Sequence, residues 1–200
     1  MTVPTVRKLT LDDIADVRAY DRERPAYRAQ ILELRRRRRV AVGTVITVAF
    51  ESRETVRYQI QEMARAEKLT SDAELQVELD TYNPLVPEPR QLCATLFLEL
   101  TTDEQLREWL PKLVGIERHV LIRMSDGSTV RAEPEHQHAA RLTREHTTSA
   151  VHYLTFAFTD DAIQAMAGGG AMLAIDHPAY REDVALTDFT IEELLTDLRP

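Results

Sequence analysis

The stretch ELRRRRRVAVGTVITVAF, Glu33–Phe50, contains the change from helix to strand that sets the fold class of this chain. Before the arginines, apolar side chains recur at helical spacing at Tyr27, Ile31 and Leu34. After them, β-branched residues dominate. The pattern predicts a helix that leads into one strand, Arg39–Phe50, with Gly43 as a bulge in that strand.

The arginine run, Arg35–Arg39, suggests a nucleic-acid site, but the chain as a whole is acidic, with a formal net charge of -8. Residues 1–60 hold 13 basic and 8 acidic groups, whereas residues 61–200 hold 12 and 25. The five side chains fan around a helix axis, and the adjoining segment RVAVG contains no aromatic residue that could stack on bases. We therefore expect no nucleic-acid binding, and attribute the run to the negative end of the helix dipole and to ion pairs with the acidic body.

Composition favours a single soluble domain. A chain of 200 residues with 44% hydrophobic residues can bury a full core, so we expect one domain over residues 1–200, with a helical segment at 1–38 and a sheet-containing body at 39–200. No segment has the apolar length of a membrane span, and the first residues lack a signal-peptide core. Cys93 is the single cysteine, which excludes an intrachain disulfide or a four-cysteine cluster and favours the cytoplasm.

Capping residues and periodicity divide the rest of the chain. Helices are expected after Thr10, from Pro25, after Ser52, across 71–82, after Thr102, across 159–167 and across 190–198. Strands are expected across 39–50, 91–100, both arms of the hairpin in 119–133, 149–158 and 171–176. Six strands with intervening helices predict an α+β fold, with a mixed or mainly antiparallel sheet covered by helices.

Two conspicuous motifs favour ordinary structural roles. The triple glycine of AGGGA, Ala167–Ala171, leaves a helix and enters a strand, which is the reverse of a phosphate-binding loop. The cluster of His136, His138 and His146 lacks the usual zinc spacing and a nearby cysteine, so we expect a solvated segment there. We predict no bound metal and no cofactor.

Seven polar residues at the ends of elements form the candidate site: Tyr58, Gln59, Glu62, Asn83, His152, His177 and Tyr180. The first three lie on or beside a polar helix face, which is more often simply solvated. His152 alternates onto an apolar strand face, as a hydrogen-bonded core histidine also would, and turn chemistry can explain Asn83 and His177. Because buried polar groups need partners, we predict that the seven line one pocket, with Glu62 as the acceptor for a histidine.

Four ordered segments resemble one bacterial family: YQIQEM (58–63), ELDTYNPLVP (78–87), SAVHYLTF (149–156) and DHPAYR (176–181). With KLT and RRRRRVAVG before them, they are similar to domain-of-unknown-function family 3501 over nearly the whole chain. The resemblance implies a cytosolic protein often encoded beside a rubrerythrin-like diiron protein and an iron–sulfur oxidoreductase. It implies no activity.

Two classes of function follow. One is an accessory or binding protein of a redox or oxidative-stress module, with a redox protein as partner. The alternative is a small enzyme or metal-binding protein that uses Glu62, His152 and His177. Neither nucleic acid nor membrane is expected as a partner, and a homo-oligomer stays open. Convergence of the seven polar residues in one pocket would favour the enzyme.

Overall fold

The computed structural model describes residues 8–135, 143–144 and 146–199. The helices are α1 (Val17–Arg38), α2 (Arg53–Glu67), α3 (Asp72–Tyr82), α4 (Asp103–Lys112), α6 (Asp160–Ala167) and α7 (Asp188–Leu198), with short 3₁₀ turns η1 (Leu11–Asp13), η2 (Asn83–Leu85) and η3 (Ile116–Arg118). The strands are β1 (Arg39–Val42), β2 (Ile46–Glu51), β3 (Gln91–Leu98), β4 (Val120–Arg123), β5 (Thr129–Pro134), β6 (Thr143–Arg144), β7 (Thr147–Thr148), β8 (Val151–Ala157), β9 (Met172–His177) and β10 (Tyr180–Ala185).

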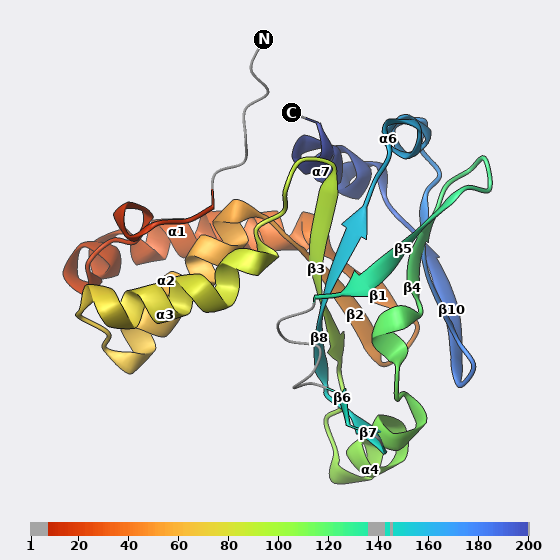
Figure 1. The fold of residues 1–200 in the computed structure, drawn as a ribbon, viewed down its shortest axis with the longest axis horizontal. Helices are drawn as coiled ribbons and strands as arrows, with labels where there is room; N and C mark the ends of the chain where they lie inside the picture. The colour runs from red at the N-terminus through yellow and green to blue at the C-terminus, as the bar shows by residue number, and fades with distance from the viewer. Residues whose placement is uncertain (1–7, 136–142, 145, 200) are drawn as a thin grey trace.

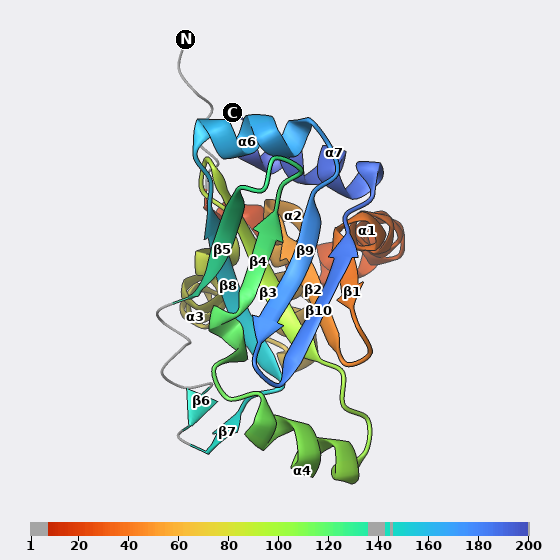
Figure 2. The same ribbon diagram turned by 90° about the vertical axis from the view of Figure 1, so that its right-hand side faces the viewer.

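Eight strands form a nearly closed barrel in the order β1-β2-β3-β8-β5-β4-β9-β10, and every described ladder in it is antiparallel. Figure 2 shows α6 and α7 across one end of this barrel and α4 at the other. The α+β class is confirmed. The expected count of about six strands is wrong, because two strands were not recognised in the sequence.

The first additional strand arises at Gly43. The chain does not continue as one strand through this glycine but turns back, so that Val42 pairs with Ile46 and Arg39 with Ala49. Gly43 has a φ of 66°, a left-handed conformation that glycine adopts without strain. The glycine therefore makes a tight hairpin turn, not a bulge.

The second additional strand, β10, follows the turn at Pro178. Tyr180 pairs with His177, and the ladder continues to Ala185 opposite Met172. The sequence YREDVA lacks the alternation of apolar residues that marks a half-buried strand, because most of its side chains are exposed. Pairing with β9 and closure of the barrel hold this strand in place.

The N-terminal part forms one long helix, not the two that Thr10 and Pro25 indicated. Thr10 and Asp13 make a capping box around η1 only, and Asp16 then caps α1. Pro25 lies inside α1, at an exposed position. Proline removes one helical hydrogen bond, and packing of the flanking turns on α2 keeps the helix continuous through it.

Two hydrophobic cores hold these parts together. The larger fills the barrel and includes Leu96, Leu154 and Phe156, all fully buried. A smaller one joins α2 and α3 to the N-terminal segment through Ile60 and Leu79. Figure 1 shows α1, α2 and α3 as an arm that extends from one side of the barrel. The helical part therefore includes α2 and α3 as well as the N-terminal segment described from residue 8 to residue 38. Within the described residues, no helix is both long and apolar enough to cross a bilayer.

Candidate functional site

The sequence suggested that the polar face of α2 is solvated. In the structure this face packs on α1 instead. Gln61 is buried and exchanges two hydrogen bonds with the backbone of Ala15. Tyr58 is also buried, with its ring edge-on to that of Tyr27 at 5.8 Å between centroids. Antiparallel packing of the two helices gives these polar groups internal partners, so the face is an interface within the arm.

Glu62 lies at the centre of this interface. Its two oxygens accept hydrogen bonds from Nε and Nη2 of Arg24, both at 2.7 Å, and one also accepts from the Tyr20 hydroxyl at 2.5 Å. The Arg24 guanidinium, which outweighs the effect of burial, lowers the pKa of Glu62 to about 2. The prediction that a histidine pairs with Glu62 is wrong, because both of its oxygens already have partners on α1.

Removing this carboxylate should weaken the arm. Glu62→Gln leaves Arg24 without its anion and the buried Tyr20 hydroxyl with a weaker acceptor, so we expect a loss of about 1–3 kcal/mol in unfolding free energy at pH 7. A carboxylate with a lowered pKa stabilises the fold above its ordinary pKa of 4.5 and loses that effect as the pH falls toward 2. Urea denaturation at pH 7 and pH 3 should therefore show a smaller difference between variant and wild type at pH 3. Exposed Glu67→Gln is the matched control, and an equal loss there would refute the assignment.

Asn83 serves the N-terminal segment. Its side-chain oxygen accepts from the Leu9 amide at 2.8 Å, and its side-chain nitrogen donates to the Leu9 carbonyl at 2.9 Å. This paired contact holds the segment before η1 against η2. Both ends of the amide group are occupied by backbone.

His152 is a core histidine with its own partners. It is 2% exposed and points into the barrel, as the strand alternation predicted. Its Nε2 lies 2.8 Å from the Thr148 hydroxyl and 3.0 Å from the Ser149 carbonyl oxygen. Burial lowers the pKa of His152, although the carboxylate of Glu117, 3.9 Å from Nδ1, opposes this effect.

His177 and Tyr180 lie at the end of the β9–β10 hairpin. Nε2 of His177 lies 3.2 Å from the Val114 carbonyl oxygen, and its Nδ1 accepts from the Ala179 amide. The Tyr180 hydroxyl donates to the Val42 carbonyl at 2.8 Å and accepts from the Thr44 amide at 3.0 Å. Tyr180 thus joins β10 to the β1–β2 turn and closes the barrel.

His119 is not one of the seven candidate residues, yet it belongs to a polar cluster beside this hairpin. Its Nδ1 lies 2.9 Å from an Asp176 oxygen, and its ring packs edge-on against that of His177 at 4.9 Å. Two hydrogen bonds from Arg131 to Asp176, more than the contact with His119, lower the pKa of Asp176 to about 2. The neighbouring strand positions of these residues become apparent only from the sheet order.

The seven candidate residues therefore do not line one pocket. Six of them have separate partners within the protein: Glu62, Asn83, His152, His177 and Tyr180 form hydrogen bonds with different segments, and the Tyr58 ring packs on Tyr27. Of the seven, Gln59 alone lines the large cavity between the helical arm and the barrel. His136 and His138 lie outside the described residues, and the described side chains include no group of three or more His, Cys, Asp or Glu arranged to hold a metal ion.

A cavity of about 560 Å³ lies between the arm and the outer face of β2, β3 and β8. Its walls are mainly apolar and include the aromatic side chains of Phe97, Tyr82 and Tyr153. The pKa values of Tyr82 and Tyr153 are raised, mainly because the two side chains are partly buried. Four of the five consecutive arginines, Arg35, Arg36, Arg38 and Arg39, also line it. The junction of α1 and β1 thus places these four arginines along the cavity.

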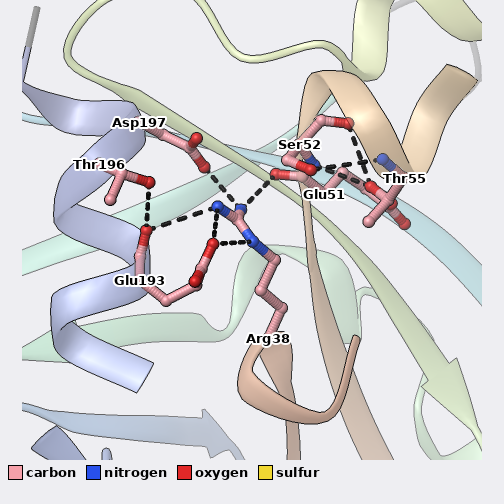
Figure 3. Close-up of polar contacts among 7 residues, drawn as sticks. All are labelled: Arg38, Glu51, Ser52, Thr55, Glu193, Thr196 and Asp197. Atoms are coloured by element: carbon pink, nitrogen blue, oxygen red, sulfur yellow. Dashed lines mark hydrogen bonds and ion pairs between the residues drawn. The ribbon is translucent and has the colours of Figure 1, made fainter. Parts of the chain in front are cut away.

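Arg38 is the structural member of the run. It is 2% exposed, and its guanidinium binds Glu193 at 2.9 Å and Asp197 at 2.6 Å, both on α7. It also donates to the Glu51 carbonyl at 3.1 Å. Figure 3 shows the guanidinium surrounded by these acceptors. Ion pairing keeps the pKa of Arg38 above its ordinary value in spite of burial, so this arginine ties the junction of α1 and β1 to α7.

Arg35 differs from its neighbours. Arg36 pairs with Glu33, and Arg39 pairs with Glu99. Arg35 is half-buried with its guanidinium 5.2 Å from the centre of the Tyr58 ring. Among the described residues no carboxylate pairs with it. The cavity thus has one cation that is held by an aromatic ring and still open to an anion.

Glu51 provides the opposite charge in the same cavity. Its two carboxylate oxygens accept hydrogen bonds from the hydroxyls of Thr55 at 2.6 Å and Thr95 at 2.7 Å. Within the described part of the chain, no cation pairs with this carboxylate. The two threonines hold it in one orientation against the cavity.

Cys93 lies on β3, but its thiol is not reactive. It is 2% exposed, and burial raises its pKa to about 11. The thiolate needed for nucleophilic or redox chemistry is therefore scarce at neutral pH.

Comparison with known proteins gives a family and a fold without an activity. Residues 8–198 match the family model described as a protein of unknown function, DUF3501. A crystal structure of a protein of unknown function from Burkholderia pseudomallei K96243 is similar, with 34% sequence identity and a TM-score of 0.88. The match covers 96% of this chain and 100% of the other. The search of curated proteins found no match.

Proposed function

The chain belongs to the DUF3501 family of proteins of unknown function, and we propose that it is an accessory binding protein whose ligand is a small amphipathic organic anion. The ligand occupies the cavity between the arm and β2, β3 and β8. The observation that carries this proposal is Arg35, a half-buried cation without a carboxylate partner among the described residues, beside mainly apolar walls.

The physical argument combines two contributions. A ligand with an apolar body gains from leaving water for the aromatic and aliphatic walls. Its acidic group gains a charge-assisted contact with a guanidinium that is already oriented over Tyr58. Ligands that lack either part would forgo one contribution, which makes an amphipathic acid the best match.

Family resemblance adds the setting. It supports a role in a redox or oxidative-stress module in the cytoplasm, with the rubrerythrin-like protein or the iron–sulfur oxidoreductase as partner. The enzyme alternative has less support, since Glu62, His152 and His177 contact different neighbours.

The test uses 8-anilinonaphthalene-1-sulfonate, an aromatic anion whose fluorescence rises in apolar sites. We expect saturable binding with one probe per chain. Arg35→Met, which retains an apolar stem, should weaken binding about tenfold, the effect of one charge-assisted contact. Arg28→Met is the matched control, because Arg28 is exposed on the same helix and does not line the cavity.

A second variant tests the location of the probe. Ala49 lines the cavity from β2, and Ala49→Trp should fill part of the volume and block binding. Undiminished fluorescence in Ala49→Trp, or equal affinity in Arg35→Met and wild type, would overturn the proposal. Circular dichroism of each variant verifies that the fold is retained.

A further inference from the structure

We infer that the natural ligand of the cavity is dipolar: an organic acid that also carries an ammonium group, which pairs with Glu51. This inference rests on the proposed function and deepens it. It is based on the second charged group of the cavity, the Glu51 carboxylate, which a simple organic anion would leave without an oppositely charged partner.

The Glu51 carboxylate is fixed in orientation, but no cation among the described residues forms an ion pair with it. Two threonine hydroxyls fix its carboxylate oxygens, but a neutral hydroxyl does not compensate the negative charge. Arg38, the nearest buried cation, binds only the backbone carbonyl of Glu51 and gives its ion pairs to α7. A carboxylate beside apolar walls is stabilised by an opposite charge, and here the ligand can provide it.

The two charged residues come from different elements, Arg35 from α1 and Glu51 from β2, and both line the same cavity. Each is contacted from α2, where the Thr55 hydroxyl donates to Glu51 and the Tyr58 ring lies beside the Arg35 guanidinium. The apolar walls between them suit a hydrocarbon or aromatic body.

Charge placement also argues against a ligand with a negative group at each end. Such a ligand would bring one of its anions against the Glu51 carboxylate, where the like charges would repel each other. A purely cationic ligand would meet the same penalty at Arg35. Only a molecule with one charge of each sign satisfies both poles.

The experiment compares 6-aminohexanoate, 8-aminooctanoate and 11-aminoundecanoate with the unsubstituted fatty acid of equal length, by displacement of bound 8-anilinonaphthalene-1-sulfonate. We expect at least one amino acid of the series to bind about tenfold more tightly than its fatty acid, the effect of a charge-assisted pair. In Glu51→Gln this preference should vanish, while fatty acid binding is retained or strengthened.

Retained fatty acid binding also shows that Glu51→Gln is folded, so the variant cannot mislead through misfolding. If no amino acid in the series is preferred over its fatty acid, or if the preference survives Glu51→Gln, the dipolar ligand is wrong. The anionic probe would still bind in that case, and the proposed function would stand. If wild type does not bind the probe, both the proposed function and the dipolar ligand are refuted.

Discussion

Replacing Arg38 by methionine is expected to lower the unfolding free energy by about 3–5 kcal/mol, the cost of removing one partner from a buried ion pair. Methionine matches the apolar stem but leaves Glu193 and Asp197 together without a cation. It also removes the donor to the Glu51 carbonyl. Because these contacts join α1 to α7, the loss should appear as global destabilisation in urea denaturation.

The pH dependence identifies the mechanism. Burial already raises the pKa of Asp197 above its ordinary value of 3.8, against the effect of Arg38. Without the arginine, Asp197 should bind a proton more readily in the folded state. A raised folded pKa penalises the fold at high pH, and protonation removes that penalty, so the deficit of Arg38→Met should shrink as the pH falls from 7 toward 4.

Exposed Arg37→Met is the control for this prediction. Among the residues that the structure describes, Arg37 pairs only with Glu33 on the helix surface, and such pairs contribute about 0–1 kcal/mol. If Arg37→Met and Arg38→Met cost the same, the buried cluster of Figure 3 does not tie α1 to α7 as described.

Gly43→Ala is expected to cost about 2–4 kcal/mol, since it combines backbone strain with the loss of the barrel closure. An L-residue at the φ of 66° costs about 1–2 kcal/mol. A Cβ at this position would also overlap the Tyr180 hydroxyl oxygen, with the Glu182 side chain close by. Displacing that hydroxyl would leave buried backbone groups without a partner, at about 1–3 kcal/mol.

Two further variants separate these causes. Gly127→Ala has a similar φ of 87° with nothing within 4 Å of its added carbon, so it should show the backbone cost alone. Tyr180→Phe removes the hydroxyl, and Gly43→Ala should cost less in that background than in wild type. Urea denaturation of wild type, the two single variants and the double variant gives the unfolding free energies for this double-mutant cycle. Additive costs would contradict the close approach of Gly43 and Tyr180.

Local sequence signals predicted the elements whose ends carry their own capping groups. Ser52 and Thr102 each cap a helix as expected, because a capping box needs residues only three positions apart. The alternation around His152 likewise predicted its burial and its need for partners. Prediction failed where an element depends on a distant neighbour, as β10 depends on β9 and on Tyr180.

The candidate site shows the same limit. The sequence around Glu62, Asn83 and His177 indicated that each side chain needs a hydrogen-bond partner. It did not indicate which residue that partner would be. Their convergence was a wrong inference, since local backbone groups and α1 satisfied them first. Arg35 and Glu51, which have no ion-pair partner among the described residues, carried no distinguishing signal: Arg35 is one of five consecutive arginines, and Glu51 is a single carboxylate at the end of an apolar strand.

By itself, the sequence determined the α+β class, most helix boundaries and the acidic body with a basic head. These follow from periodicity, capping and composition, all of which act over a few residues or over the whole chain. Only the tertiary structure decided that Arg38 is buried while Arg35 is left without a carboxylate partner among the described residues. The two are chemically identical, and their fates differ because α7, 155 positions away, presents its carboxylates to one of them alone.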